Sequence, residues 1–166
     1  MPDPNPDNLL PVDSPDRKRL PPLLRRAWYS LNQAFRRRIA PTGATPDQFT
    51  ALRSLTEADP KGITQGELTR MMSSDPNTIA SLLERMEKAG WVERNRHETD
   101  RRAYRIKITS PGLKLFENMR DVAVDLQSQV LTVLDEKDRE DFLVKLGTVA
   151  DACREAADQS PKKKRG

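Results

Sequence analysis

The sequence has little of what metalloproteins, disulfide-rich secreted proteins and membrane proteins need. It contains one cysteine and one histidine among 166 residues, so neither a disulfide framework within the chain nor a multi-residue zinc site can be built. No apolar run approaches the roughly 20 residues of a membrane span. We therefore expect no cofactor, no metal, no membrane partner, and a reducing cytoplasmic environment.

The chain also lacks the patterns typical of catalysis. It shows no nucleophile paired with a base, no carboxylate pair in an apolar setting and no glycine-rich loop that could hold a phosphate. We therefore expect that the protein is not an enzyme.

Charge is balanced over the body of the chain. The formal net charge is +4, and the C-terminal run Lys162–Arg165 supplies four positive charges, which leaves 25 basic against 25 acidic residues. Recognition of an acidic partner must therefore depend on where the charges lie, because their sum is zero outside the tail.

Proline and apolar spacing divide the chain into segments. Residues 1–18 hold five of the thirteen prolines, and we expect them to be disordered, as we do the basic tail 160–166. A helix is predicted at about 20–40, because one apolar stripe follows its helical period. That stripe consists of Leu24, Trp28, Leu31 and Phe35.

Three helix starts follow from local sequence signals. Thr45 before Pro46 reads as a cap followed by proline in the first turn. Thr64 with Glu67 is a capping box that starts a short helix, and Asp75 before Pro76 starts the next one. Gly90 is placed to end that helix, whose predicted buried stripe is Ile79, Leu82, Leu83 and Met86.

The period then changes from helical to alternating. Residues 91–94 and 104–109 alternate as strands do, with a polar segment between them that suits a hairpin tip. Ser110 before Pro111 is predicted to cap a long helix, and Asp135 with Asp138 to start the last one. The fold class is therefore mainly α with a small β-hairpin.

Two helices joined by a short turn and followed at once by a basic hairpin are typical of a winged helix-turn-helix domain. In such a domain the second helix lies in the major groove of DNA. The predicted recognition helix is 75–89, and the face opposite its apolar stripe carries polar side chains suited to base edges and phosphates. The candidate DNA-binding residues on this helix are Asn77, Thr78, Ser81 and Arg85, with Lys88 further along the same ridge.

The hairpin concentrates positive charge. Residues 94–107 hold six basic residues against two acidic ones, and arginine at a hairpin tip can enter the minor groove. A carboxylate at Asp100 could hold the guanidinium of Arg102 in a fixed orientation. The candidate DNA-binding residues of the hairpin are Arg96, Asp100, Arg101 and Arg102.

The stretch from Ser54 to Gly112 resembles the MarR family of bacterial transcriptional regulators. The similar segments are the wing, Asp100-Arg101-Arg102 followed by a strand and the pair Ile108-Thr109, and Leu83 to Val92 at the end of the recognition helix. The order of the flanking helices matches too, so the resemblance covers about residues 20–157.

The resemblance implies a MarR-like domain over 19–159, with the winged helix-turn-helix at about 45–110. Dimerisation helices would lie at about 20–40 and 111–158 and would form a homodimer on a pseudo-palindromic operator of double-stranded DNA. Arg102 would be the minor-groove arginine and Asp100 its partner. A small lipophilic or phenolic ligand would release the DNA, although no spaced motif identifies its pocket. Such a regulator would be associated with the nucleoid.

Two other functions remain open at this point. One is a constitutive or architectural DNA-binding protein without an effector, and the other is a winged-helix module that binds another protein. The operator, the regulated genes and the sign of regulation, repressor or activator, do not follow from the sequence.

Overall fold

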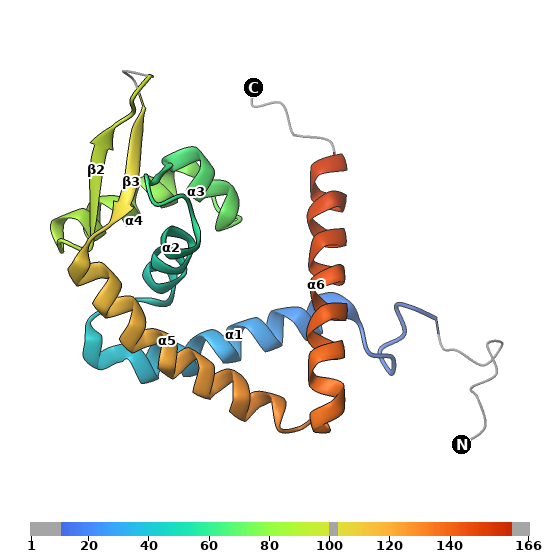
Figure 1. The fold of residues 1–166 in the computed structure, drawn as a ribbon. Helices are drawn as coiled ribbons and strands as arrows, with labels where there is room; N and C mark the ends of the chain where they lie inside the picture. Colours follow the sequence, from blue (N-terminus) through green and yellow to red (C-terminus); the bar gives the residue numbers. More distant parts are fainter. Residues whose placement is uncertain (1–10, 100–102, 161–166) are drawn as a thin grey trace. The chain divides into compact units, whose positions relative to one another are not determined.

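The computed structural model describes residues 11–99 and 103–160, and its chain divides into two compact units, Met1–Ala123 and Val124–Gly166. The predicted fold class is confirmed, since helices dominate both units and a small sheet lies in the first (Figure 1). The helices of the first unit are α1 (Leu20–Ile39), α2 (Pro46–Glu57), α3 (Gln65–Met71), α4 (Pro76–Lys88) and most of α5 (Ser110–Leu131). Its strands are β1 (Ile63–Thr64), β2 (Val92–Arg96) and β3 (Tyr104–Ile108), and the second unit holds the end of α5 and α6 (Glu136–Gln159).

The predicted starts of α2, α3 and α4 are confirmed. The Thr64 hydroxyl accepts the Glu67 backbone N–H, while the Glu67 carboxylate accepts the Thr64 backbone N–H over 2.7 Å. Thr45 forms a second capping box with Gln48, in which the Gln48 side chain accepts the Thr45 N–H over 2.9 Å. These boxes satisfy backbone donors that a helix start would otherwise leave without partners.

The core of the first unit is built around α4. The four predicted side chains of its apolar stripe are all buried, each with at most 2% of its surface exposed. Burying a side chain of this size contributes roughly 1.5–3 kcal/mol, so the stripe orients α4 and leaves its opposite face to solvent. α4 contacts α2, α3 and β2, and the other large buried side chains of this unit include Leu52, Leu68, Ile106 and Met119.

The sheet has three strands, one more than the predicted hairpin. β3 lies in the middle and pairs antiparallel with both β1 and β2, with Ile63 opposite Ile106 on one side. The two residues of β1 are too short to show an alternating pattern in the sequence. Gly62 permits this pairing, because it has φ +89° and an added Cβ would lie 2.5 Å from the Ile106 carbonyl oxygen.

The start of α5 packs directly against the turn that follows α4. The Thr109 hydroxyl donates to the Gly90 carbonyl over 2.6 Å and accepts the Gly112 backbone N–H over 3.2 Å. The predicted cap at Ser110 is therefore wrong by one residue: α5 begins at Ser110, and Thr109 supplies the capping oxygen. The physical reason is that Thr109 also completes the strand, since its N–H donates to the Trp91 carbonyl over 3.1 Å.

Each unit exposes large apolar side chains on a helix, the first unit on α1 and the second on α6. On α1 the aromatic ring of Phe35 contacts Phe49, with centroids 4.9 Å apart, whereas Trp28 is 65% exposed. In the second unit large apolar side chains of α6 are exposed as well, among them Phe142, Val144 and Leu146. Among the described residues, none of the helices has the combination of length and hydropathy that crossing a bilayer requires.

Gly112→Ala is expected to destabilise the protein by about 1–3 kcal/mol or more. An added Cβ would lie 2.0 Å from the Trp91 carbonyl oxygen, so the turn after α4 and the start of α5 would have to separate. Thermal or urea unfolding of the purified variant measures the loss. Gly66→Ala is the matched control, because its Cβ would only reach the Thr64 hydroxyl at 4.0 Å. Equal stability of the two variants would contradict the close packing at Gly112.

Candidate nucleic-acid interface

The solvent face of α4 carries the predicted recognition residues together. Asn77, Thr78, Ser81 and Arg85 are all exposed, on the side of the helix opposite its buried stripe. The turn between α3 and α4 includes Ser73, whose φ of 49° lies in the left-handed region. Because all four side chains are exposed, no other described element of the first unit covers this face of α4.

The N-terminus of α4 is already capped by a carboxylate. Asp75 accepts the backbone N–H groups of Asn77 and Thr78, and it also accepts the Thr78 hydroxyl. Hydrogen bonds from the Thr78 hydroxyl and then the Thr78 backbone lower the pKa of Asp75 below its ordinary value of 3.8. A phosphate is therefore not needed to satisfy these donors, and Thr78 acts as a helix-capping partner in addition to being a candidate DNA contact.

Two basic side chains of α4 contact groups of their own helix. Arg85 Nε donates to the Ser81 carbonyl over 3.2 Å, and Lys88 Nζ lies 2.8 Å from Glu84 Oε1. Exposed contacts of this kind contribute roughly 0–1 kcal/mol. Both cations can exchange these contacts for phosphate or base acceptors at little cost.

The wing consists of β2, β3 and the segment between them. Arg96 is exposed near the end of β2, opposite Tyr104 in the register, and the His97 N–H donates to the Ala103 carbonyl over 3.1 Å. The predicted residues Asp100, Arg101 and Arg102 lie outside the described residues. Their assignment therefore stays a prediction from the sequence.

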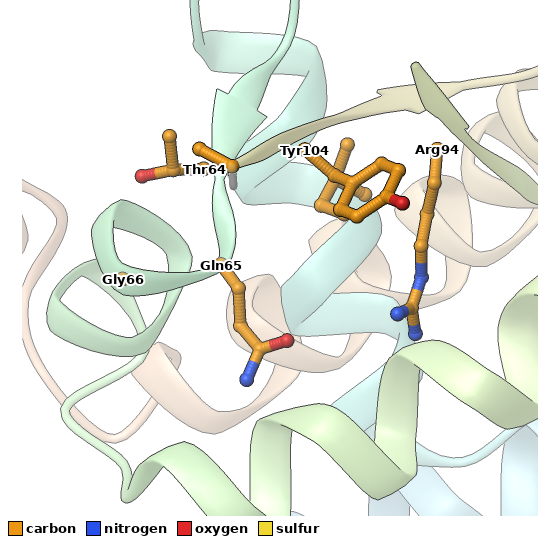
Figure 2. Close-up of a pocket in the computed structure, with 7 residues that line it drawn as sticks. Thr64, Gln65, Gly66, Arg94 and Tyr104 are labelled. Atoms are coloured by element: carbon orange, nitrogen blue, oxygen red, sulfur yellow. The ribbon is translucent and has the colours of Figure 1, made fainter. Parts of the chain in front are cut away.

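A shallow hollow of about 230 Å³ separates the start of α3 from the wing. Figure 2 shows Tyr104 and Arg94 on the wing side of this hollow and Gln65 with Gly66 on the α3 side. The Gln65 amide also donates to the Pro76 carbonyl over 3.2 Å and so connects α3 to the first turn of α4. Sequence reasoning did not single out Gln65, and it left Tyr104 open between packing and a bond to phosphate, because neither belongs to a charge pattern or a helical ridge.

Arg94 was counted in the basic hairpin but not as a site residue. Its Nε lies 3.2 Å from Glu87 Oε2 on the last turn of α4. The sequence places these residues seven positions apart on two different elements, so no helical or strand spacing pairs them. Within the part of the chain that the structure describes, no cluster of three or more His, Cys, Asp or Glu side chains could hold a metal ion.

The sequence matches known regulators over the region just described. The model of the MarR family matches residues 44–104. The chain is 31% identical to the multiple antibiotic resistance protein MarR of Escherichia coli over 110 residues, which cover 64% of this chain and 75% of that protein. It is 28% identical to the transcriptional regulator PecS of Dickeya dadantii over 90 residues, 54% of each. The chain thus spans about half the length of PecS, and 65% of the regulator BilQ of Clostridium symbiosum.

Solved structures of similar fold include complexes with DNA. The crystal structure of the MepR–DNA complex from S. aureus has a TM-score of 0.75 at 20% identity and covers 82% of this chain and 99% of that one. A variant of E. coli MarR complexed with operator DNA has a TM-score of 0.70 at 26% identity and covers 77% of this chain and 91% of that one. At 20% identity the likeness to MepR shows the fold alone.

The capping carboxylate of Glu67 is expected to make the stability of the protein depend on pH. Its pKa lies below the ordinary value of 4.5, chiefly because the Thr64 backbone N–H and then the Thr64 hydroxyl donate to it. A lowered pKa in the folded state stabilises the fold above pH 4.5, and this contribution is lost as the pH falls through the folded value. Because Glu67 is partly exposed, the contribution should be about 0.2–1 kcal/mol.

The measurement is thermal unfolding of the parent and Glu67→Gln between pH 3 and pH 7. Glutamine can still form the capping box, so the variant removes the charge alone. We expect the parent to be more stable at pH 6 and the difference to disappear near pH 3. Glu117→Gln, which removes an exposed carboxylate from α5, corrects for the change in net charge. A difference that grew on acidification would contradict the assignment.

Proposed function

The chain belongs to the MarR family, and on this basis we propose that it is a sequence-specific DNA-binding transcriptional regulator. It acts as a homodimer on a pseudo-palindromic operator in double-stranded DNA. A protein with this role works on the chromosome, so the proposal includes a cytoplasmic, nucleoid-associated location. It also includes transcriptional regulation as the only activity of the chain, without catalysis.

One observation carries the proposal: a polar helix face and a basic wing lie beside each other in one unit. Asn77, Ser81 and Arg85 are exposed on α4, which is joined to β2 through the turn at Gly90. Asparagine can bind adenine and arginine can bind guanine through two hydrogen bonds, while hydroxyl groups suit phosphate or base edges. Arg102, with its guanidinium oriented by Asp100, would enter the neighbouring minor groove, and Arg96 and Arg101 would add positive charge beside it.

The exposed apolar side chains and the charges of α1 and α6 support the homodimer. Trp28 and Leu31 of α1 are 65% and 45% exposed. Large apolar side chains exposed together on one helix face are typical of protein–protein contacts. The charges of α1 and α6 are complementary: α1 has five arginines and no acidic residue, whereas α6 has seven acidic against four basic residues. A two-fold axis that brings α1 of one protomer onto α6 of the other would cover the apolar faces and pair these charges.

Release by a small lipophilic or phenolic effector completes the proposal. The first unit contains a hollow of about 290 Å³ whose lining includes Leu55, Ile108 and Leu113, with Lys107 beside them. The lining also includes the carboxylate of Asp59, so the cation is not the only charge there. A mainly apolar lining that also carries hydrogen-bonding groups suits a phenol, and the volume is close to the lower end of small-molecule sites. The competing function is a constitutive DNA-binding protein, which no effector would displace.

Selection of bound sequences from random duplex DNA at near-physiological salt, followed by gel shift, tests the proposed DNA binding. We expect a pseudo-palindrome with half-sites about 34 Å apart, one helical turn. Arg85→Ala and Arg102→Ala should each weaken specific binding by about 1–3 kcal/mol. Arg154→Ala removes the same charge from α6, where Arg154 pairs with Asp151 of its own helix, and should leave the affinity unchanged once sedimentation shows that the variant is still a dimer.

Each other outcome of this assay has a defined meaning. Salt-sensitive binding without sequence preference would favour the architectural role, and no binding by a folded dimer would favour the protein-interaction module. Adding phenolic and lipophilic compounds to the complex should displace the duplex. Full retention of DNA across such a panel would favour the constitutive binder.

Trp28→Glu is expected to convert the dimer into monomers by placing a charge in the proposed interface. The side chain is largely exposed in the single chain, so the fold of the first unit should survive. Sedimentation velocity measures the oligomeric state, and circular dichroism checks the helix content. Ser30→Glu adds the same charge on the exposed side of α1 away from the stripe and should stay dimeric. A dimer that persisted in the Trp28 variant would refute this placement of the interface.

A further inference from the structure

One ion pair joins the wing to the recognition helix. Arg94 extends from β2, and its Nε lies 3.2 Å from Glu87 Oε2 on the last turn of α4. Figure 2 shows the Arg94 side chain directed away from its strand toward the neighbouring helix. By contrast, the pairs Lys88–Glu84, Lys145–Asp141 and Arg154–Asp151 each join neighbours within one helix.

The pair is more buried than those within the helices. The side chains of Arg94 and Glu87 are 30% and 43% exposed, against 74% and 62% for Lys88 and Glu84. Arg94 Nε is buried and makes no hydrogen bond within the described residues, so its contact with Glu87 is ionic. A partly desolvated charge depends strongly on its partner, since removing the partner leaves it uncompensated.

The position of Arg94 in the sheet explains why it can reach α4. It lies opposite Ile106, which is buried, so both side chains lie on the face of the sheet that is turned to the core. The residue two positions further along β2 is Arg96, about 7 Å away at the usual rise per residue. A change in the angle of the hairpin at Arg94 would therefore displace the exposed arginine of the wing.

We propose that Arg94 is a positioning residue that docks the base of the wing onto the last turn of α4 through Glu87. The ion pair sets the angle between the recognition face and the wing, and DNA is contacted by other residues. This inference rests on the proposed DNA binding. It assigns Glu87 a structural role, although a carboxylate beside the DNA-reading face would by itself repel phosphates.

Glu87→Gln gives the sharpest test, because the two possible roles predict opposite results. If charge alone mattered, removing a carboxylate near DNA and freeing Arg94 would raise the affinity. The docking role predicts a loss of about threefold to tenfold. Arg94→Gln should lose about tenfold, and the swap Glu87→Arg with Arg94→Glu should recover most of the affinity, because the ion pair is restored with its charges exchanged.

The salt dependence of binding separates positioning from direct contact. Log K falls as log salt rises, and each lost phosphate contact reduces the magnitude of this negative slope by about 0.9. The swap Glu87→Arg with Arg94→Glu should restore the magnitude of the parental slope together with the affinity, because a positioning residue acts through its ion pair. Arg96→Gln should reduce that magnitude if Arg96 contacts phosphate. A reduced slope for Arg94→Gln together with a failed swap would mean that Arg94 contacts DNA, and would overturn the proposal. Unchanged affinity in both Arg94→Gln and Glu87→Gln would overturn it too.

Hydrogen exchange on the free full-length protein tests the docking without DNA. Amides of residues 92–96 and 104–108 should exchange faster in Arg94→Gln and in Glu87→Gln, and at the parental rate in Arg96→Gln. If the parent bound no DNA, the proposed function would fail, while this measurement would still decide the docking. Parental exchange rates in both variants would refute it.

Discussion

The arrangement of the first unit depends on the close approach of two backbone segments, the turn after α4 and the first turn of α5. At Gly112 no side chain fits, because a Cβ would lie 2.0 Å from the Trp91 carbonyl. The Thr109 hydroxyl connects the same two segments, because it donates to the Gly90 carbonyl and accepts the Gly112 N–H. The end of α4, the last strand of the wing and the start of α5 are therefore held at one junction. A displacement of the start of α5 would therefore also displace the end of α4 and the wing.

Charge acts in this protein through its placement. Outside the C-terminal run the chain is neutral, yet the hairpin and α1 are basic while α6 is acidic. At the hairpin the excess of arginine suits DNA, and on α1 it suits the acidic α6 of a second copy. The carboxylates near the reading face are engaged rather than free: Asp75 caps α4, Glu84 contacts Lys88 and Glu87 contacts Arg94. Lys88 lowers the pKa of Glu84, and Arg94 contributes to the same shift.

Local signals predicted most of the secondary structure. The caps at Thr45, Thr64 and Asp75 and the apolar stripe of α4 depend on residues three or four positions apart, so they can be read directly from the sequence. Features formed by distant residues were missed. β1 was not predicted because two residues show no period, and the cap of α5 was assigned to Ser110 because the bond between Thr109 and Gly90 spans 19 positions. The same holds for the candidate site, where the ridge of α4 was predicted while Gln65, Tyr104 and the pairing of Arg94 were not.

The sequence by itself determined the helix order, α4 with its buried and polar faces, and the basic character of the wing. These follow from periodicity and capping, which are properties of short segments and can be read without knowledge of the fold. The tertiary structure alone decided that β1 completes a three-stranded sheet, that Gly62 and Gly112 must be glycines, and that Arg94 meets Glu87. These depend on distances between segments far apart in the chain, and such distances are set by how the buried side chains pack together rather than by any local preference.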